Sequence, residues 1–140
     1  MSISLGSGVD EAIRAHGAET YPNECCGALI GRNGVVTATY ALPNTTEEGP
    51  RRRFLVRPQD YREAEKRASE MGAELLGFYH SHPDHPALWS QTDFAEAHWF
   101  SCSYVITSVE KGKAVLTNSF ELTGTDEDDK KLEKEKIEMT

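Results

Sequence analysis

The stretch GFYHSHPDHPALWSQTDF, residues 77–94, contains three of the chain's five histidines and sets the expectations for the fold around it. It begins inside the apolar run AELLGFY, which indicates a strand. Pro83 removes a backbone donor, so the strand is expected to end just beyond His82. Ser90 stands three residues before Asp93, a pattern typical of a helix N-terminus. The stretch therefore predicts a strand, a turn and a helix in succession.

The two histidines at the end of this strand indicate a metal site. His80 and His82 are two positions apart, so both side chains project from the same face of the strand. The turn after Pro83 would return the chain to Asp93, one helical turn beyond Ser90. Two imidazoles and one carboxylate are typical of a catalytic zinc ion that keeps its fourth position for water. We therefore expect one zinc ion per chain, held by His80, His82 and Asp93.

A zinc-bound water needs a proton acceptor, and Glu24 is the candidate because it directly precedes the apolar stretch CCGALIG. Spacing alone does not separate Glu24 from the many other acids of the chain. Ser90 is a candidate to donate a hydrogen bond to the oxyanion of a tetrahedral intermediate. Glu24 and Ser90 are therefore candidate catalytic residues beside the three ligands.

The flanking sequence predicts one domain of the α/β class, a mixed sheet with helices on its faces. Residues 43–51 are turn-rich and charged, which indicates a surface loop. The domain is expected over residues 1–122. Residues 123–140 form a separate charged tail, whose composition suits a frayed helix or a solvated extension. The other expected elements are helices over about 10–17 and 58–71, strands over 26–32, 35–42 and 73–82, and a hairpin over 103–122.

Composition argues against several classes of protein. A net charge of -8 and a pI near 5.1 argue against a nucleic-acid partner, because phosphate binding depends on Lys and Arg. The N-terminus lacks a basic start followed by an apolar run, and no segment approaches about 20 apolar residues, so neither a secretory signal nor a membrane partner is expected. Three cysteines without CxxC spacing make a disulfide framework unexpected and favour a cytoplasmic location.

The segment HSHPDHPALWSQTD resembles the His-x-His-Pro-x6-Ser-x2-Asp signature of the JAMM (MPN+) metalloproteases. Its fixed positions are met by His80, His82, Pro83, Ser90 and Asp93. The segment YPNECCGALIG is similar to the family segment in which a glutamate precedes Cys-Gly and an apolar strand, which implies that Glu24 is the catalytic glutamate. The resemblance covers roughly residues 8–122 and is closest to small stand-alone prokaryotic members, through HSHPDHPA and SYVI-SV.

The resemblance implies a cytidine-deaminase-like α/β fold and a zinc-dependent peptidase or isopeptidase. Such members are associated with cleavage of the amide bond after the C-terminal glycine of a ubiquitin-like or sulfur-carrier protein, for example releasing cysteine or a conjugated lysine. The implied partner is therefore a carrier protein that ends in Gly-Gly. Members of this subgroup often have Arg-Pro before the signature serine, where this chain has Leu88-Trp89, so substrate preference stays open.

Contacts with the substrate are less well defined by the sequence. Arg51, Arg52 and Arg53 suit a clamp on an extended tail, and a solvated charged loop explains them equally well. Trp89 suits either packing or substrate contact. A non-catalytic MPN-type protein-binding module is the alternative function, although such a module is expected to have lost part of the ligand set. Oligomeric state, monomer or homodimer, also stays open.

Overall fold

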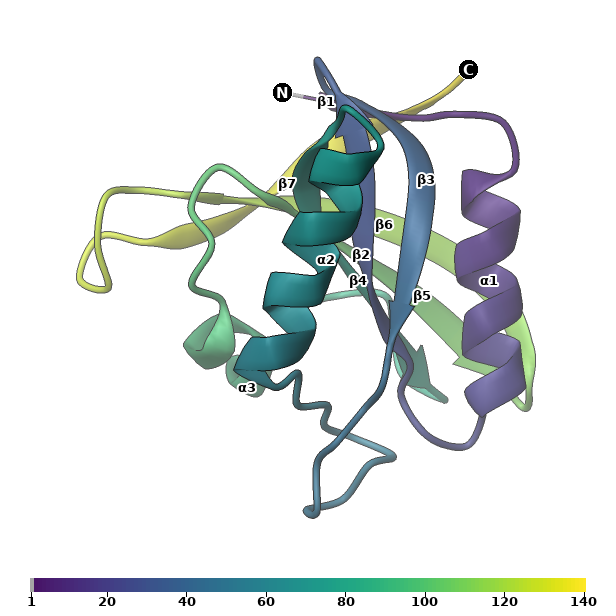
Figure 1. Cartoon of the computed structure of the whole chain (residues 1–140). Coiled ribbons are helices and arrows are strands. Elements are labelled where there is room, and N and C mark those ends of the chain that lie inside the picture. Colours follow the sequence, from purple (N-terminus) through teal and green to yellow (C-terminus); the bar gives the residue numbers. More distant parts are fainter. Residues whose placement is uncertain (1) are drawn as a thin grey trace.

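The computed structural model describes residues 2–140 (Figure 1). Seven strands form one mixed sheet that closes into a barrel in the order β1-β3-β2-β4-β5-β6-β7. The elements are β1 (Ser2–Leu5), α1 (Val9–Thr20), β2 (Cys26–Arg32), β3 (Val35–Leu42), α2 (Pro58–Glu70), β4 (Glu74–Pro83), α3 (Gln91–Glu96), β5 (Ser103–Glu110), β6 (Lys113–Thr123) and β7 (Lys131–Met139). The expected single-domain α/β fold, a mixed sheet flanked by helices, is confirmed.

Helices α1 and α2 cover opposite faces of the central strands. Successive side chains of a strand point to opposite faces, and Phe78 and Tyr79 show this directly. Tyr79 packs in the cluster that contains Ile13 of α1, whereas Phe78 packs in the cluster that contains Ala64 of α2. His80 therefore projects from the face that α2 covers, two residues along the strand from Phe78.

Strand β4 lies inside the sheet rather than at an edge. It pairs antiparallel with β2 and parallel with β5, so both of its backbone edges are hydrogen-bonded. His80 lies opposite Cys26 on one side and Ile106 on the other, and His82 lies opposite Ser108. His80 is thus carried by a backbone that is paired on both edges, and His82 by one that is paired with β5.

Gly27 on β2 leaves room for the ring of its partner Tyr79 on β4. A Cβ atom on Gly27 would overlap the ring of Tyr79, which is 2% exposed and bonded through its hydroxyl to His16 Nδ1 at 2.7 Å. The Cys-Gly pair after Glu24 therefore has a packing reason in this fold. Only a residue without a side chain fits there.

The expectation for the C-terminal tail is wrong, because residues 131–139 form strand β7 instead of a helix or a solvated extension. β7 pairs antiparallel with β6 and parallel with β1, and it closes the barrel. Its charged side chains are mostly exposed, while Leu132 is buried and Ile137 packs against the core. Backbone pairing on both edges outweighs the polar composition that suggested a separate tail.

Helix α1 is also longer than expected, because Gly17 does not end it. Gly17 is buried where the helix approaches the sheet, and a Cβ atom there would lie 3.0–3.3 Å from side chains of Val109, Ser81 and Thr107. The glycine permits close packing and the helix continues to Thr20. Among the helices within residues 2–140, none has the length and apolar character required to cross a membrane.

Candidate metal centre

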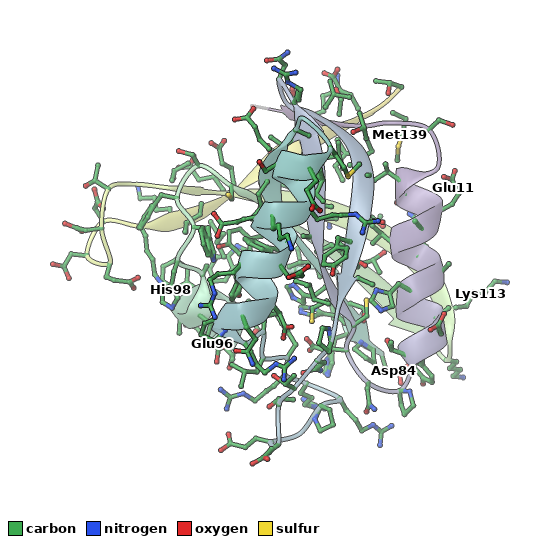
Figure 2. The ribbon with its side chains drawn as sticks, viewed as in Figure 1. Glu11, Asp84, Glu96, His98, Lys113 and Met139 are labelled. Atoms are coloured by element: carbon green, nitrogen blue, oxygen red, sulfur yellow. The ribbon has the colours of Figure 1, made fainter. Side chains whose placement is uncertain are left out.

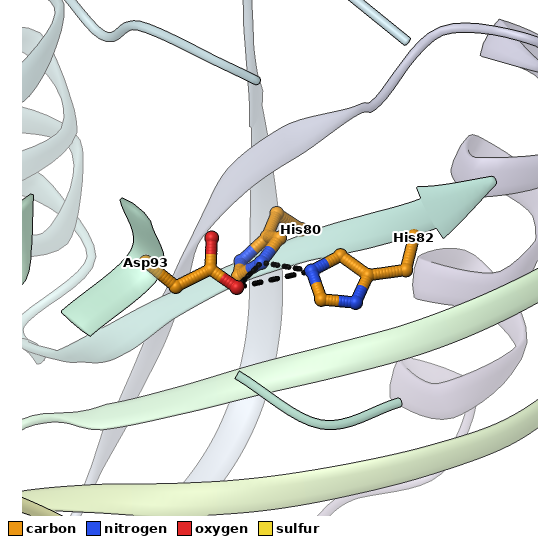
Figure 3. A group of neighbouring side chains, drawn as sticks. All are labelled: His80, His82 and Asp93. Atoms are coloured by element: carbon orange, nitrogen blue, oxygen red, sulfur yellow. Dashed lines mark hydrogen bonds and ion pairs between the residues drawn. The ribbon is translucent and has the colours of Figure 1, made fainter. Parts of the chain in front are cut away.

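The side chains of His80, His82 and Asp93 converge on one point (Figure 3). The two histidine Nε2 atoms are 3.2 Å apart. Asp93 Oδ2 lies 3.2 Å from His80 Nε2 and 3.0 Å from His82 Nε2. Asp93 comes from α3 and both histidines come from β4, so the turn of residues 84–90 brings the third side chain back to the first two. The structure thus brings together the three ligands expected from the sequence.

The spacing of these three atoms suits a small tetrahedral metal ion. Ligand atoms at about 2.0–2.1 Å from zinc are separated from one another by about 3.3–3.4 Å, so the observed 3.0–3.2 Å requires shifts of only a few tenths of an ångström. His80 and His82 are buried and the side chain of Asp93 is 11% exposed. The fourth corner has no further His, Cys, Asp or Glu in the group formed within residues 2–140.

The second nitrogen of His82 fixes the ring for metal binding. His82 Nδ1 lies 2.8 Å from the carbonyl oxygen of Pro86. Because a carbonyl oxygen only accepts, we infer that Nδ1 carries the hydrogen and that the Nε2 lone pair is left for a metal. The His80 ring is held by stacking against Phe54, with 4.7 Å between ring centroids.

Asp93 is held as a carboxylate by its neighbours. Burial opposes its ionisation, but the charge of His80 and hydrogen bonds from the His80 ring and from the Ser90 N–H hold the pKa of Asp93 far below its usual range. Burial lowers the pKa of His80, yet the charge and hydrogen bond of Asp93 outweigh burial and raise the pKa overall. The cluster is therefore arranged around a negative oxygen that attracts a cation.

Ser90 and Asp93 form the expected N-terminus of α3. The Ser90 Oγ accepts from the Asp93 N–H at 3.0 Å, and the Ser90 N–H donates to Asp93 Oδ2 at 2.9 Å. This capping box sets the direction of the carboxylate. The hydroxyl hydrogen of Ser90 takes no part in the bond that Oγ accepts, so Oγ keeps its capacity to donate.

Glu24 lies beside the cluster as a buried acid. It is 4% exposed, and its Oε1 has no hydrogen-bond partner among residues 2–140. Burial raises the pKa of Glu24 to about 8, His80 opposes the rise and Asp93 adds to it. A buried carboxyl oxygen without a partner costs stability, and such groups cluster at functional sites. Sequence spacing alone could not single out this acid.

Two hollows border the cluster. A cavity of about 340 Å³ is lined mainly by apolar side chains and is bordered by His80, Asp93 and Trp89. A groove of about 400 Å³ has a mixed lining: Glu24, Arg52, His82, His85, Pro86, Leu88, Ser90 and Thr92. The expected substrate contacts Trp89 and Arg52 thus each border one of the two hollows beside the cluster.

Arg53 differs from Arg52 because it is already paired. Its guanidinium lies 3.3 Å from Glu48 and 2.9 Å from Glu96, so it ties the loop of residues 43–57 to α3. The same loop is held by Asn44, which sequence patterns did not identify. The Asn44 amide donates to the carbonyl oxygens of Glu24 and Arg53. Asparagine is common in turns, so its presence here gave no signal of a link to Glu24.

Comparison with known proteins places the chain in a family. The family model for prokaryotic homologs of the JAB domain matches residues 7–123. The chain is 31% identical over 112 residues to the desampylase of Haloferax volcanii, covering 76% of this chain and 80% of that protein. It is 37% identical over 109 residues to the probable TtuB-protein conjugate cleaving protease of Thermus thermophilus, covering 78% of this chain and 72% of that protein.

Solved structures agree with the sequence comparison. A protein of Desulfitobacterium hafniense is similar with a TM-score of 0.83 and 33% identity, covering 100% of this chain and 93% of that chain. A JAB1/MPN domain protein of Archaeoglobus fulgidus shares the fold with a TM-score of 0.66 at 17% identity, covering 99% and 98%. The JAMM/MPN resemblance is thereby confirmed, and the chain belongs to the prokaryotic branch of the JAB-domain family.

Proposed function

We propose that the chain is a zinc-dependent peptidase or isopeptidase. Its reaction would hydrolyse the amide bond after the C-terminal glycine of a ubiquitin-like or sulfur-carrier protein that ends in Gly-Gly. The observation that carries the proposal is the convergence of His80, His82 and Asp93 beside the buried, unpaired carboxyl of Glu24. Support for the substrate class comes from the conjugate-cleaving protease and the desampylase, at 37% and 31% identity.

In this proposal His80, His82 and Asp93 hold the zinc ion. The ion would supply a Lewis acid that polarises the carbonyl and lowers the pKa of water. Glu24 accepts a proton from the water that attacks the carbonyl carbon. When the carbon–nitrogen bond breaks, Glu24 returns that proton to the nitrogen, and the amine leaves. The products are a carrier with a free terminal carboxylate and a free amine.

Ser90 has a separate role in the same step. Its Oγ is fixed by the Asp93 N–H, and its hydroxyl hydrogen is free to donate to the oxyanion of the tetrahedral intermediate. We further propose that Arg52 and Trp89 contact the substrate on the two sides of the cluster, since each borders one of the two hollows. Arg53 would act on the loop rather than on the substrate, because both of its ion pairs are internal.

The experiment that tests this proposal combines metal analysis with a cleavage assay. Carrier proteins that end in Gly-Gly are offered with the leaving group joined through an α-amide or through a lysine isopeptide. We expect one zinc per chain and chelator-sensitive cleavage of at least one of the two kinds of conjugate. Stoichiometric zinc without cleavage of either would instead favour a non-catalytic MPN-type binding module.

The cellular location belongs to the same proposal. Cys25, Cys26 and Cys102 are free thiols, and burial raises the pKa of Cys25 to about 11 and of Cys26 to about 12. Unpaired thiols of this kind are typical of a reducing compartment. We therefore propose that the enzyme acts in the cytoplasm. The raised pKa values also argue against a cysteine nucleophile.

A further inference from the structure

A buried lysine from the C-terminal segment, Lys130, contacts the C-terminal end of the helix that carries Asp93. The side chain of Lys130 is 3% exposed. Its Nζ donates to the carbonyl oxygens of Phe94 at 2.8 Å, Ala97 at 3.1 Å and Ala95 at 3.4 Å. Lys130 directly precedes β7, which lies outside the residues matched by the family model. A segment distant in sequence therefore contacts the end of α3.

The position of the ammonium group follows from the chemistry of a helix end. The last carbonyl groups of a helix have no partner inside it, and a cation is favourable there. α3 has only six residues, and at its end the Phe94 carbonyl accepts from the Ala97 N–H at 3.3 Å, so Lys130 adds a second donor to this carbonyl. A buried ammonium is tolerated where carbonyls and a carboxylate surround it, and Glu127 supplies the carboxylate at 2.8 Å.

Glu127 links this contact to the chain that leaves α3. Its other oxygen lies 3.1 Å from His98 Nδ1. Figure 2 shows His98 and Glu96 on the side of the molecule toward which the turn between β6 and β7 extends. The segment before β7 thus holds both the last turn of α3 and the residues after it.

The contact reaches the metal ligand through one residue. Phe94 directly follows Asp93, and Lys130 binds its carbonyl oxygen and lies 4.8 Å from the centroid of its ring. At the other end of α3, the capping box between Ser90 and Asp93 fixes the first turn. The ligand helix is therefore held at both ends, once by its own N-cap and once by Lys130.

We propose that Lys130 is a positioning residue for the metal centre, which keeps α3 in place so that Asp93 Oδ2 lies beside the two histidine nitrogens before the metal binds. This inference rests on the proposed function, since it concerns the same metal site. Without the ammonium, three carbonyl oxygens lose a donor and α3 loosens. Part of the free energy of metal binding would then be used to order the helix.

The test measures the zinc affinity of the folded protein by competition with a chromophoric chelator. Lys130→Met keeps an apolar stem of similar length but removes the ammonium. The matched control is Lys134→Met, which removes the same charge from an exposed position on β7. We expect zinc affinity to fall about tenfold for Lys130→Met and to stay within about twofold of the parent protein for Lys134→Met.

The outcomes separate this inference from the proposed function. A Lys130→Met protein that binds zinc within about twofold of the parent overturns the role of Lys130, whereas a parent protein that binds no zinc overturns the proposed function itself. If Lys130→Met does not fold, Glu127→Gln decides, because it removes the carboxylate partner from an exposed position. We expect its zinc affinity to fall about threefold, and an unchanged affinity contradicts the inference.

Discussion

Strand β4 and helix α3 supply the residues of the same candidate metal site in different ways. β4 lies between two paired strands, and His80 and His82 are buried on it. α3 is six residues long, has no buried residue and depends on a capping box, an ion pair from Arg53 and the ammonium of Lys130. The comparison shows a site with one fixed half and one half that is held by side-chain contacts. Substitutions near β4 should change stability, and those near α3 should change metal affinity.

The largest expected effect is on the rate of cleavage and comes from a substitution of Glu24, the acid beside the half of the site on β4. Glu24→Gln keeps the shape of the side chain but cannot accept a proton, so cleavage should fall by about 10³-fold, within the range for loss of a general acid–base group. Zinc binding should remain, because Glu24 is not among the ligands. Glu65→Gln, on the exposed surface of α2, is the control and should leave both quantities unchanged. Cleavage at the parent rate by Glu24→Gln would remove Glu24 from the mechanism.

The next effect concerns the barrel itself. Gly27→Ala places a methyl group in the ring of Tyr79, so the free energy of unfolding should fall by about 3 kcal/mol. Ala41→Ser, at the exposed position opposite Gly27 on β3, should change it by less than about 0.5 kcal/mol. Chemical denaturation of the metal-free proteins measures both. Equal stability of Gly27→Ala and the parent would show that Tyr79 can move aside.

A pH effect follows from the buried acid. The pKa of Glu24 is raised from 4.5 to about 8, so the folded chain keeps a proton that the unfolded chain releases above pH 4.5. The folded state therefore loses stability as pH rises toward about 8, by about 2 kcal/mol for the metal-free protein after allowance for water entering the site. Denaturation at several pH values checks the slope. The same slope in Glu24→Gln would assign it to another group.

The smallest effect tests the half of the site on α3. Ala95→Gly in this short helix should reduce zinc affinity by about fivefold, because glycine costs about 1 kcal/mol in a helix and binding must then order more backbone. Ala18→Gly in α1 makes the same change at an exposed position in another helix, and should lower stability without changing zinc affinity. If zinc affinity changed equally in the two variants, the order of α3 would have no special influence on metal binding.

The sequence predicted the local parts of the site well. Strand spacing placed His80 and His82 on one face, and Ser90 three residues before Asp93 predicted the helix start that the structure has. These features depend on neighbours within a few residues. The expectation for Glu24 rested on the family resemblance, because the approach of Glu24 to the cluster depends on the pairing of β2 with β4.

Contacts between distant segments could not be predicted from local patterns. Nothing in the periodicity of residues 123–140 showed that β7 would pair with β1 and β6. The many charged residues of β7 are not typical of a strand. The contacts of Phe54 with His80, of Asn44 with Glu24 and of Lys130 with α3 are all tertiary. A buried lysine in a charged tail looks the same in sequence as an exposed one.

A crystal structure of the zinc-loaded protein, with anomalous diffraction at the zinc edge, tests the shared metal site most directly. We expect one ion at about 2.0–2.2 Å from His80 Nε2, His82 Nε2 and Asp93 Oδ2, with water at the fourth position. A permanent fourth protein ligand, or a zinc ion bound without Asp93, would contradict the proposal that this site activates water for hydrolysis.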